Sequence, residues 1–143
     1  MGQVTAIRTG PLPSEREWQQ ALVDLFERFR WAVQHVYPLR TQHGWRTGTT
    51  ASGWPDLVML RGHRLVALEV KGVRTALRPE QRAWLMRFED VGARALVLRP
   101  TDDWELIVRW AAHPEEMPER FGWEPLPEDH PLYPRLPAGK RWR

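Results

Sequence analysis

Two short apolar stretches joined by a tight turn constrain the fold of this chain more than any other feature. They cover residues 57–60 and 65–70, and the turn between them contains Gly62. Short runs rich in valine and leucine on either side of a glycine turn are typical of a β-hairpin. Because side chains alternate between the faces of a strand, Glu69 and Lys71 share the face opposite to the core residues. The sequence therefore predicts a hairpin with one apolar face and one charged face.

The charged face of this hairpin is a candidate for chemistry. Asp56 directly precedes the first strand, and antiparallel pairing across a short turn brings it close to the Glu69 end of the second strand. Two carboxylates beside the Lys71 ammonium suit a divalent cation or a phosphate; the alternative is an ordinary surface ion pair worth roughly 0–1 kcal/mol. Lys71 and Lys140 are the only lysines among 21 lysine and arginine residues. A lysine here departs from the arginine background, which favours a compact ammonium beside an activated water.

Length and composition exclude several classes of protein. The chain has 143 residues, which suits one domain, and no cysteine, which excludes disulfide frameworks and cysteine-ligated zinc. No apolar run approaches the ~20 residues of a membrane span, and the N-terminus lacks the apolar h-region of a signal peptide, so neither a span nor a signal peptide is expected. A cytoplasmic protein of a bacterial or phage-infected cell is expected. The net charge of +3 permits nucleic-acid binding, although general arginine usage accounts for it equally well.

The first helix is predicted to begin at Ser14. This serine and Glu17, three residues later, form a capping-box pattern. Apolar residues then recur at helical spacing, namely Trp18, Ala21, Leu22, Leu25, Phe26 and Phe29. At about 100° per residue, Glu15 lies toward this stripe and Glu17 falls well off it. We expect Glu17 to cap the helix and Glu15 to look toward the sheet, unless both only complement the helix dipole.

Further periodic segments complete an α/β pattern. Residues 31–37 read as a strand ended by a proline, and residues 39–53 read as a loop. A second helix is predicted from Pro79 to about Val91, because proline suits the first helical position. An apolar strand follows at residues 94–99, and residues 100–101 open a third helix. The predicted order is helix, three strands, helix, strand, helix.

The end of the chain has a different character. Seven of the 13 prolines lie in residues 114–143, so neither a helix nor a strand is predicted there. Its apolar residues favour docking onto the domain over free disorder. We therefore divide the chain into an N-terminal arm (1–13), one domain (14–113) and a proline-rich tail (114–143), which either wraps the domain or binds a partner.

Three motifs occur in a fixed order and carry a family resemblance. They are Gly-Trp-Pro-Asp at residues 53–56, Glu-Val-Lys at 69–71 and Pro-Glu-Gln-Arg-Ala-Trp-Leu at 79–85. In this order they resemble the PD-(D/E)xK nuclease superfamily, and more narrowly its VRR-NUC group, over roughly residues 13–103. The resemblance implies an α/β, restriction-endonuclease-like core in the order α-β-β-β-α-β-α, with a mixed sheet flanked by helices.

The resemblance also implies roles for individual residues. Catalytic roles fall on Asp56, Glu69 and Lys71, with Gln81 as an auxiliary polar residue unless it simply faces water. Ligands for Mg²⁺ or Mn²⁺ are Glu15, Asp56, Glu69 and the carbonyl of Val70. Hard oxygen ligands of this kind suit either ion. The bound ion would polarise the scissile phosphate and acidify a water.

Nucleic-acid contacts are expected on the segment before Asp56. Residues 39–53 contain arginines, hydroxyls and glycines but no acid, as a sugar-phosphate contact surface requires, although a solvated loop has the same composition. Trp45 or Trp54 either stacks on a base or packs against the core. His35 is either a structural strand residue or a phosphate contact. The predicted nucleic-acid-binding residues are His35, Arg40, Arg46, Thr49, Ser52 and Arg74.

Three hypotheses of function follow. The first is a metal-dependent DNA endonuclease. Its resemblance to Holliday-junction resolvases implies 5′-phosphate ends and selectivity for branched, flap or junction DNA, and leaves open whether it acts as a homodimer. The second is a non-catalytic nucleic-acid-binding or scaffold module on the same fold. The third is an interaction protein that uses the tail and keeps only a vestigial site. The second predicts the loss of an acid or of the lysine, and the chain has lost neither.

Overall fold

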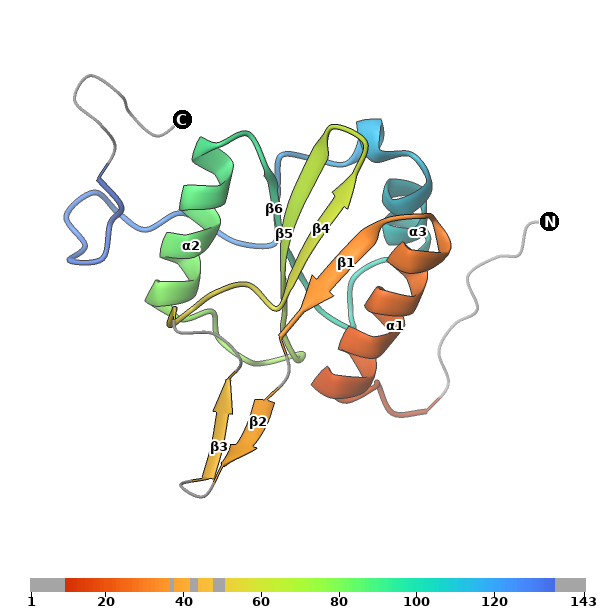
Figure 1. Ribbon diagram of the computed structural model, residues 1–143, viewed down its shortest axis with the longest axis horizontal. Helices are drawn as coiled ribbons and strands as arrows, with labels where there is room; N and C mark the ends of the chain where they lie inside the picture. The colour runs from red at the N-terminus through yellow and green to blue at the C-terminus, as the bar shows by residue number, and fades with distance from the viewer. Residues whose placement is uncertain (1–9, 37, 42–43, 48–50, 136–143) are drawn as a thin grey trace.

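A mixed five-stranded sheet lies between two layers of helices in a computed structural model of the chain (Figure 1). The structure describes residues 10–36, 38–41, 44–47 and 51–135. The elements follow in the order α1 (Glu15–Arg28), β1 (Ala32–His35), β2 (Pro38–Thr41), β3 (Gly44–Thr47), β4 (Leu57–Arg61), β5 (Arg64–Val70), α2 (Pro79–Asp90), β6 (Arg94–Leu98), α3 (Trp104–Ala112), the 3-10 turn η1 (Pro114–Glu116) and β7 (Arg120–Phe121).

The strand order of the main sheet is β1-β4-β5-β6-β7. The predicted hairpin forms β4 and β5, in which Leu57 pairs with Leu68. Strand β1 is antiparallel to β4, whereas β6 and β7 run parallel to β5. The predicted α/β fold with a mixed sheet flanked by helices is confirmed, and the chain adds the β2–β3 hairpin and β7 to the predicted order.

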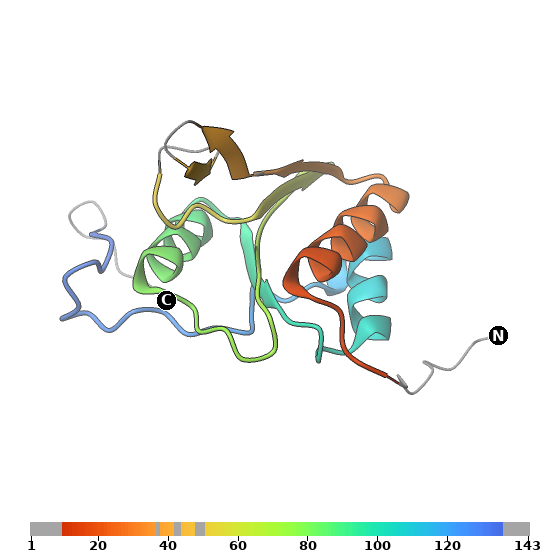
Figure 2. The same ribbon diagram turned by 90° about the horizontal axis from the view of Figure 1, so that it is seen from below.

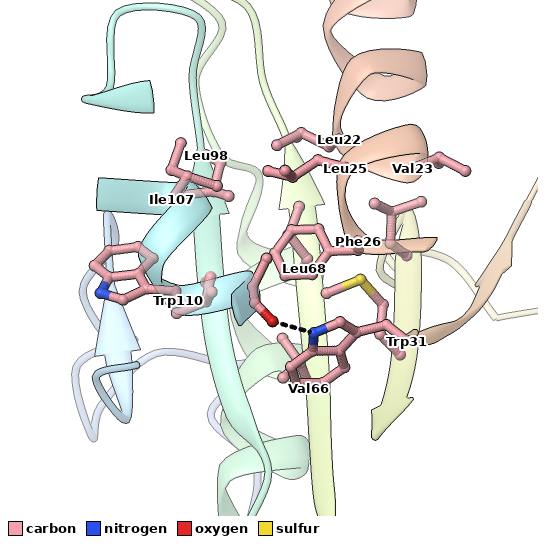
Figure 3. Packing of buried hydrophobic residues seen from close by; sticks show 14 of the residues in the cluster. Leu22, Val23, Leu25, Phe26, Trp31, Val66, Leu68, Leu98, Ile107 and Trp110 are labelled. Atoms are coloured by element: carbon pink, nitrogen blue, oxygen red, sulfur yellow. Dashed lines mark hydrogen bonds between the residues drawn. The ribbon is translucent and has the colours of Figure 1, made fainter. Parts of the chain in front are cut away.

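Helices α1 and α3 cover one face of the sheet (Figure 2). The capping box at the start of α1 is present, because Ser14 Oγ accepts from the Glu17 N–H at 3.1 Å and the Glu17 carboxylate accepts from the Ser14 N–H at 3.1 Å. The apolar stripe of α1 packs on the valines and leucines of β5. Figure 3 shows Trp31 among these buried side chains, where its indole donates a hydrogen bond to the Ala111 carbonyl at 2.9 Å.

Helix α2 and the C-terminal segment cover the opposite face (Figure 2). Buried side chains from α2 and β6 meet Trp123 and Leu126 there, and the Trp123 indole donates to the Ala95 carbonyl at 2.9 Å. The prediction of no regular structure beyond residue 114 is wrong for η1 and β7. Strand β7 extends the parallel half of the sheet by only two residues, too few to produce a detectable sequence period. The division of the chain at residue 113 stays a prediction.

Two other predicted boundaries are corrected. Residues 39–53 are not one loop, because β2 and β3 form a separate two-stranded sheet within them. Pro38 opens β2 instead of only ending the preceding strand, since a proline is tolerated at the first position of a strand. Helix α3 begins at Trp104 and not at residues 100–101, because the Asp103 carboxylate caps it by accepting from the backbone N–H of Glu105.

No helix within the described residues combines the length and hydropathy of a membrane span.

Candidate active site

Asp56, Glu69 and Lys71 converge at one end of the main sheet. Asp56 directly precedes β4, and the pairing of Leu57 with Leu68 places it beside Glu69 on β5. Its Oδ2 accepts a hydrogen bond from the Val70 N–H at 2.8 Å, which joins the two strand ends. The Lys71 N–H donates to the Leu98 carbonyl at 3.1 Å, so β5 stays paired with β6 as far as the lysine.

Glu69 is the most constrained group of this cluster. It is 2% exposed, and its Oε1 accepts from Gln81 Nε2 at 3.2 Å. Burial raises the pKa of Glu69 to about 10, helped by a hydrogen bond with Asp56 and by repulsion from Asp56 and Glu15, while the Lys71 charge opposes the rise. In the ionised state Glu69 Oε2 is buried without a donor. The neighbouring Asp56 carboxylate offers only acceptors, so either a proton or a cation between the two would satisfy both.

The donor set therefore fits a hard divalent cation. A buried carboxylate oxygen without a donor, next to a second carboxylate, is the environment in which Mg²⁺ or Mn²⁺ replaces a shared proton. The Val70 side chain points into the core, and its amide is committed to Asp56, which leaves its carbonyl as the group it offers to an ion.

The two acids of the first helical turn have different environments. The Glu15 carboxylate accepts from the Gly72 N–H at 3.2 Å and lies near enough to Glu69 to raise its pKa. The Glu17 carboxylate is committed to the helix cap at Ser14. This geometry favours Glu15 over Glu17 as the acid of the site.

Lys71 lies on the same strand face as Glu69, two residues away. Its side chain is largely buried, at 6% exposure, and its charge lowers the pKa of Glu69. The ammonium makes no ion pair or hydrogen bond within the part of the chain that the structure describes. A buried cation left without a fixed partner beside two carboxylates is available to a substrate or a water.

Gln81 is a buried bridge and does not face water. It lies in the first turn of α2, where its Oε1 accepts from the Arg78 N–H at 2.8 Å. Its Nε2 donates to Glu69 at 3.2 Å. The Gln81 side chain thus caps the N-terminal end of α2 and fixes the orientation of the buried Glu69 carboxylate.

The residues predicted to contact nucleic acid lie in several different strands and loops. His35 is half-buried in β1 opposite Leu57, while Ser52 and Arg74 are exposed in the segments before β4 and after β5. Arg40 lies in β2 and Arg46 in β3, and only their backbone is described. Thr49 lies outside the described residues.

Arg99 supports the site although no sequence motif includes it. Its Nη1 donates to the carbonyls of Gly72 at 2.6 Å and Thr75 at 2.8 Å, so it holds the loop that follows Lys71. The one available signal was its position directly after β6, the parallel neighbour of β5, where side chains of adjacent strand ends meet.

Trp54 packs against helix α2. Its ring lies edge-on against Trp84, with centroids 5.0 Å apart, and against Phe88 at 5.3 Å. This agrees with the packing alternative for Trp54, whereas base stacking on its half-buried ring stays a prediction. Trp45 lies in β3, where only the backbone is described.

A second acidic group lies away from this site. The ligand atoms of His113, Glu115 and Glu116 fall within 4.8 Å of one another, but all three side chains are exposed. Glu116 is already paired with Arg109 at 2.7 Å. Exposed acids that have a cationic partner give no reason to assign a metal here.

A mixed sheet with two carboxylates and a lysine at the ends of a central hairpin, supported by a glutamine from the next helix, defines a PD-(D/E)xK nuclease-like protein. The VRR-NUC domain family matches residues 16–102, more than half of the chain, and the chain belongs to this family. The match begins one residue after Glu15 and covers the other four positions of the site, Asp56, Glu69, Lys71 and Gln81. No curated protein matches the chain. Family membership assigns a nuclease-type role in DNA processing, with DNA as the substrate.

Proposed function

We propose that the protein is a metal-dependent DNA endonuclease that hydrolyses phosphodiester bonds. The observation that carries the proposal is the buried Glu69 oxygen without a donor, beside the Asp56 carboxylate. Such an arrangement costs stability in the free protein, and a divalent cation removes that cost. Membership of the VRR-NUC family supports the same chemistry.

Each residue of the site would have a defined task. Asp56, Glu69, the Val70 carbonyl and Glu15 would hold Mg²⁺ or Mn²⁺. The bound ion would supply Lewis acidity to the scissile phosphate and to the attacking water. Lys71 would orient that water or stabilise negative charge on the phosphate oxygens, because its ammonium is held on the same face without another partner. Gln81 would keep Glu69 in the orientation that binds the ion.

DNA would be held mainly through its backbone. The β2–β3 hairpin projects from the end of the sheet that carries the site (Figure 1). The sequence contains no aspartate or glutamate from Arg28 to Pro55, so this whole segment is free of charges that repel phosphate. We include His35, Arg40, Arg46, Thr49, Ser52 and Arg74 in the proposed contact surface.

The finer parts of the proposal concern substrate shape and assembly. Selectivity for branched, flap or junction DNA, as in Holliday-junction resolvases, would follow from backbone contacts that read shape instead of base edges. Cutting a symmetric junction would further require two copies of the site across a two-fold axis, and hence a homodimer.

Cleavage of labelled linear, flap and four-way-junction DNA in Mg²⁺, Mn²⁺ or EDTA tests the proposal. Asp56→Asn and Lys71→Met each remove a charge with little change of volume, and we expect each to slow cleavage by about 10²–10³-fold. Asp90→Ala, an exposed acid at the end of α2, is the control and should cut at the parental rate.

Parental cleavage by either site variant would show that the site is wrongly placed. An absence of cleavage with every ion and substrate would favour the non-catalytic module, which still predicts binding of the same DNA.

A further inference from the structure

We propose that Trp84 is a positioning residue for the candidate metal site, acting through the loop that carries Asp56; this rests on the proposed function. The loop, residues 51–55, passes the N-terminal end of α2 before entering β4 (Figure 1). The Trp84 indole donates to the Ser52 carbonyl at 3.0 Å, and the Trp84 ring packs edge-on against Trp54. The Trp84 side chain therefore contacts the loop on both sides of Gly53, at Ser52 and at Trp54.

Gly53 lets the loop approach α2 at backbone distance. Its φ is +86°, and a Cβ at this position would lie 2.6 Å from the carbonyl carbon of Glu80. Any side chain would push the loop away from the helix and would also strain the backbone. The Trp84 contacts and the Gly53 contact thus fix the same short segment, which ends at Asp56.

Helix α2 is itself held from its other side. Arg120 forms two hydrogen bonds with Glu89, at 3.0 and 2.7 Å, and Arg82 donates to the Glu124 carbonyl at 2.8 Å. Leu126 N–H approaches Met86 Sδ at 3.4 Å. The loop is therefore docked on an element that the C-terminal segment keeps in place.

Helix α2 consequently reaches both carboxylates. Gln81 and Trp84 are three residues apart, so they lie on neighbouring positions of one helix face. Gln81 binds Glu69 directly, whereas Trp84 binds the loop that leads into Asp56. Loosening the Trp84 contact should leave Glu69 in place and release Asp56, which changes the spacing of the two acids.

Metal affinity separates positioning from general stability. Trp84→Phe keeps a ring against Trp54 and removes the donor to Ser52. We expect the dissociation constant for Mn²⁺, measured by calorimetry without DNA, to rise about tenfold. Cleavage by Trp84→Phe should recover toward the parental rate at saturating Mn²⁺. Trp31→Phe is the matched control, because it loses an equivalent 2.9 Å bond to a backbone carbonyl in the other helical layer.

Both variants should unfold at lower urea concentration than the parent, but only Trp84→Phe should bind Mn²⁺ more weakly. Parental Mn²⁺ affinity in Trp84→Phe, with a stability loss like that of Trp31→Phe, would overturn the positioning role alone. A parent chain that binds no Mn²⁺ would overturn the proposed ion and the positioning role together.

Discussion

Glu69 is the residue at which stability and function conflict. Its carboxyl is almost fully buried, and this burial, helped by the neighbouring Asp56, raises the pKa of Glu69 to about 10. A buried carboxylate that lacks a donor destabilises a folded protein unless a proton or a cation compensates. Sites of this kind are retained where a ligand provides the compensation.

Removing this charge should stabilise the free protein and flatten its response to pH. Between the ordinary value of 4.5 and about 10, the folded chain keeps a proton on Glu69 that the unfolded chain releases. The free energy of unfolding in EDTA therefore falls as the pH rises through this window. Glu69→Gln should weaken that fall and be more stable at pH 8 by about 1–3 kcal/mol. Urea unfolding across the window, with the exposed Glu27→Gln as control, measures both effects.

Parallel pH curves for Glu69→Gln and the parent would show that the burial of this carboxyl has no energetic consequence.

Helix α2 links its own start to the site through Gln81. The same side chain accepts from the Arg78 N–H and donates to Glu69. Helix formation and the orientation of a buried carboxylate are thus coupled at the scale of one element, because the first turn of a helix always needs acceptors for its free N–H groups.

Two substitutions separate these functions of Gln81. Gln81→Ala leaves both partners unsatisfied and should lower the free energy of unfolding in EDTA by about 1–3 kcal/mol. Gln81→Glu retains the acceptor for Arg78 but adds a carboxylate beside Glu69, so its deficit should shrink when Mn²⁺ is added. Urea unfolding with and without Mn²⁺ compares them. Equal responses of the two variants to Mn²⁺ would contradict the assignment of an ion to this cluster.

The whole molecule depends on residues beyond the family match. Residues 103–135 supply α3 to one layer, and Met117, Trp123 and Leu126 are buried among side chains of the domain. The C-terminal segment therefore contributes to the burial of the sheet, since Trp123 and Leu126 pack beside the buried side chains of α2 on the second face.

Truncating Trp123 tests this contribution. Its ring is 7% exposed, its indole binds the Ala95 carbonyl, and Arg120 lies over the ring at 4.9 Å. Trp123→Ala should lower the free energy of unfolding by about 3–5 kcal/mol in a denaturant titration. Leu132→Ala, at a position 43% exposed, should stay within about 0.5 kcal/mol of the parent. A Trp123→Ala change as small as that control would mean that the segment is not part of the core.

Patterns between near neighbours in the chain predicted much of this protein. The Ser14 capping box, the alternating faces of β5 and the start of α2 at Pro79 all agree with the structure. The gathering of Asp56, Glu69 and Lys71 followed from hairpin pairing alone. These features depend on steric and hydrogen-bonding rules that act within a few residues, so the sequence is sufficient to read them.

Tertiary structure decided what distant segments do to one another. Three contacts join separate elements. Gln81 donates a hydrogen bond to Glu69, Arg99 donates one to the Gly72 carbonyl, and Trp54 packs against Trp84. The direction in which the Gln81 side chain points depends on which element packs against it, and no local period encodes that direction. Long-range contacts of this kind form only when the sheet and its two helical layers assemble, which is why they determine the environment of the site.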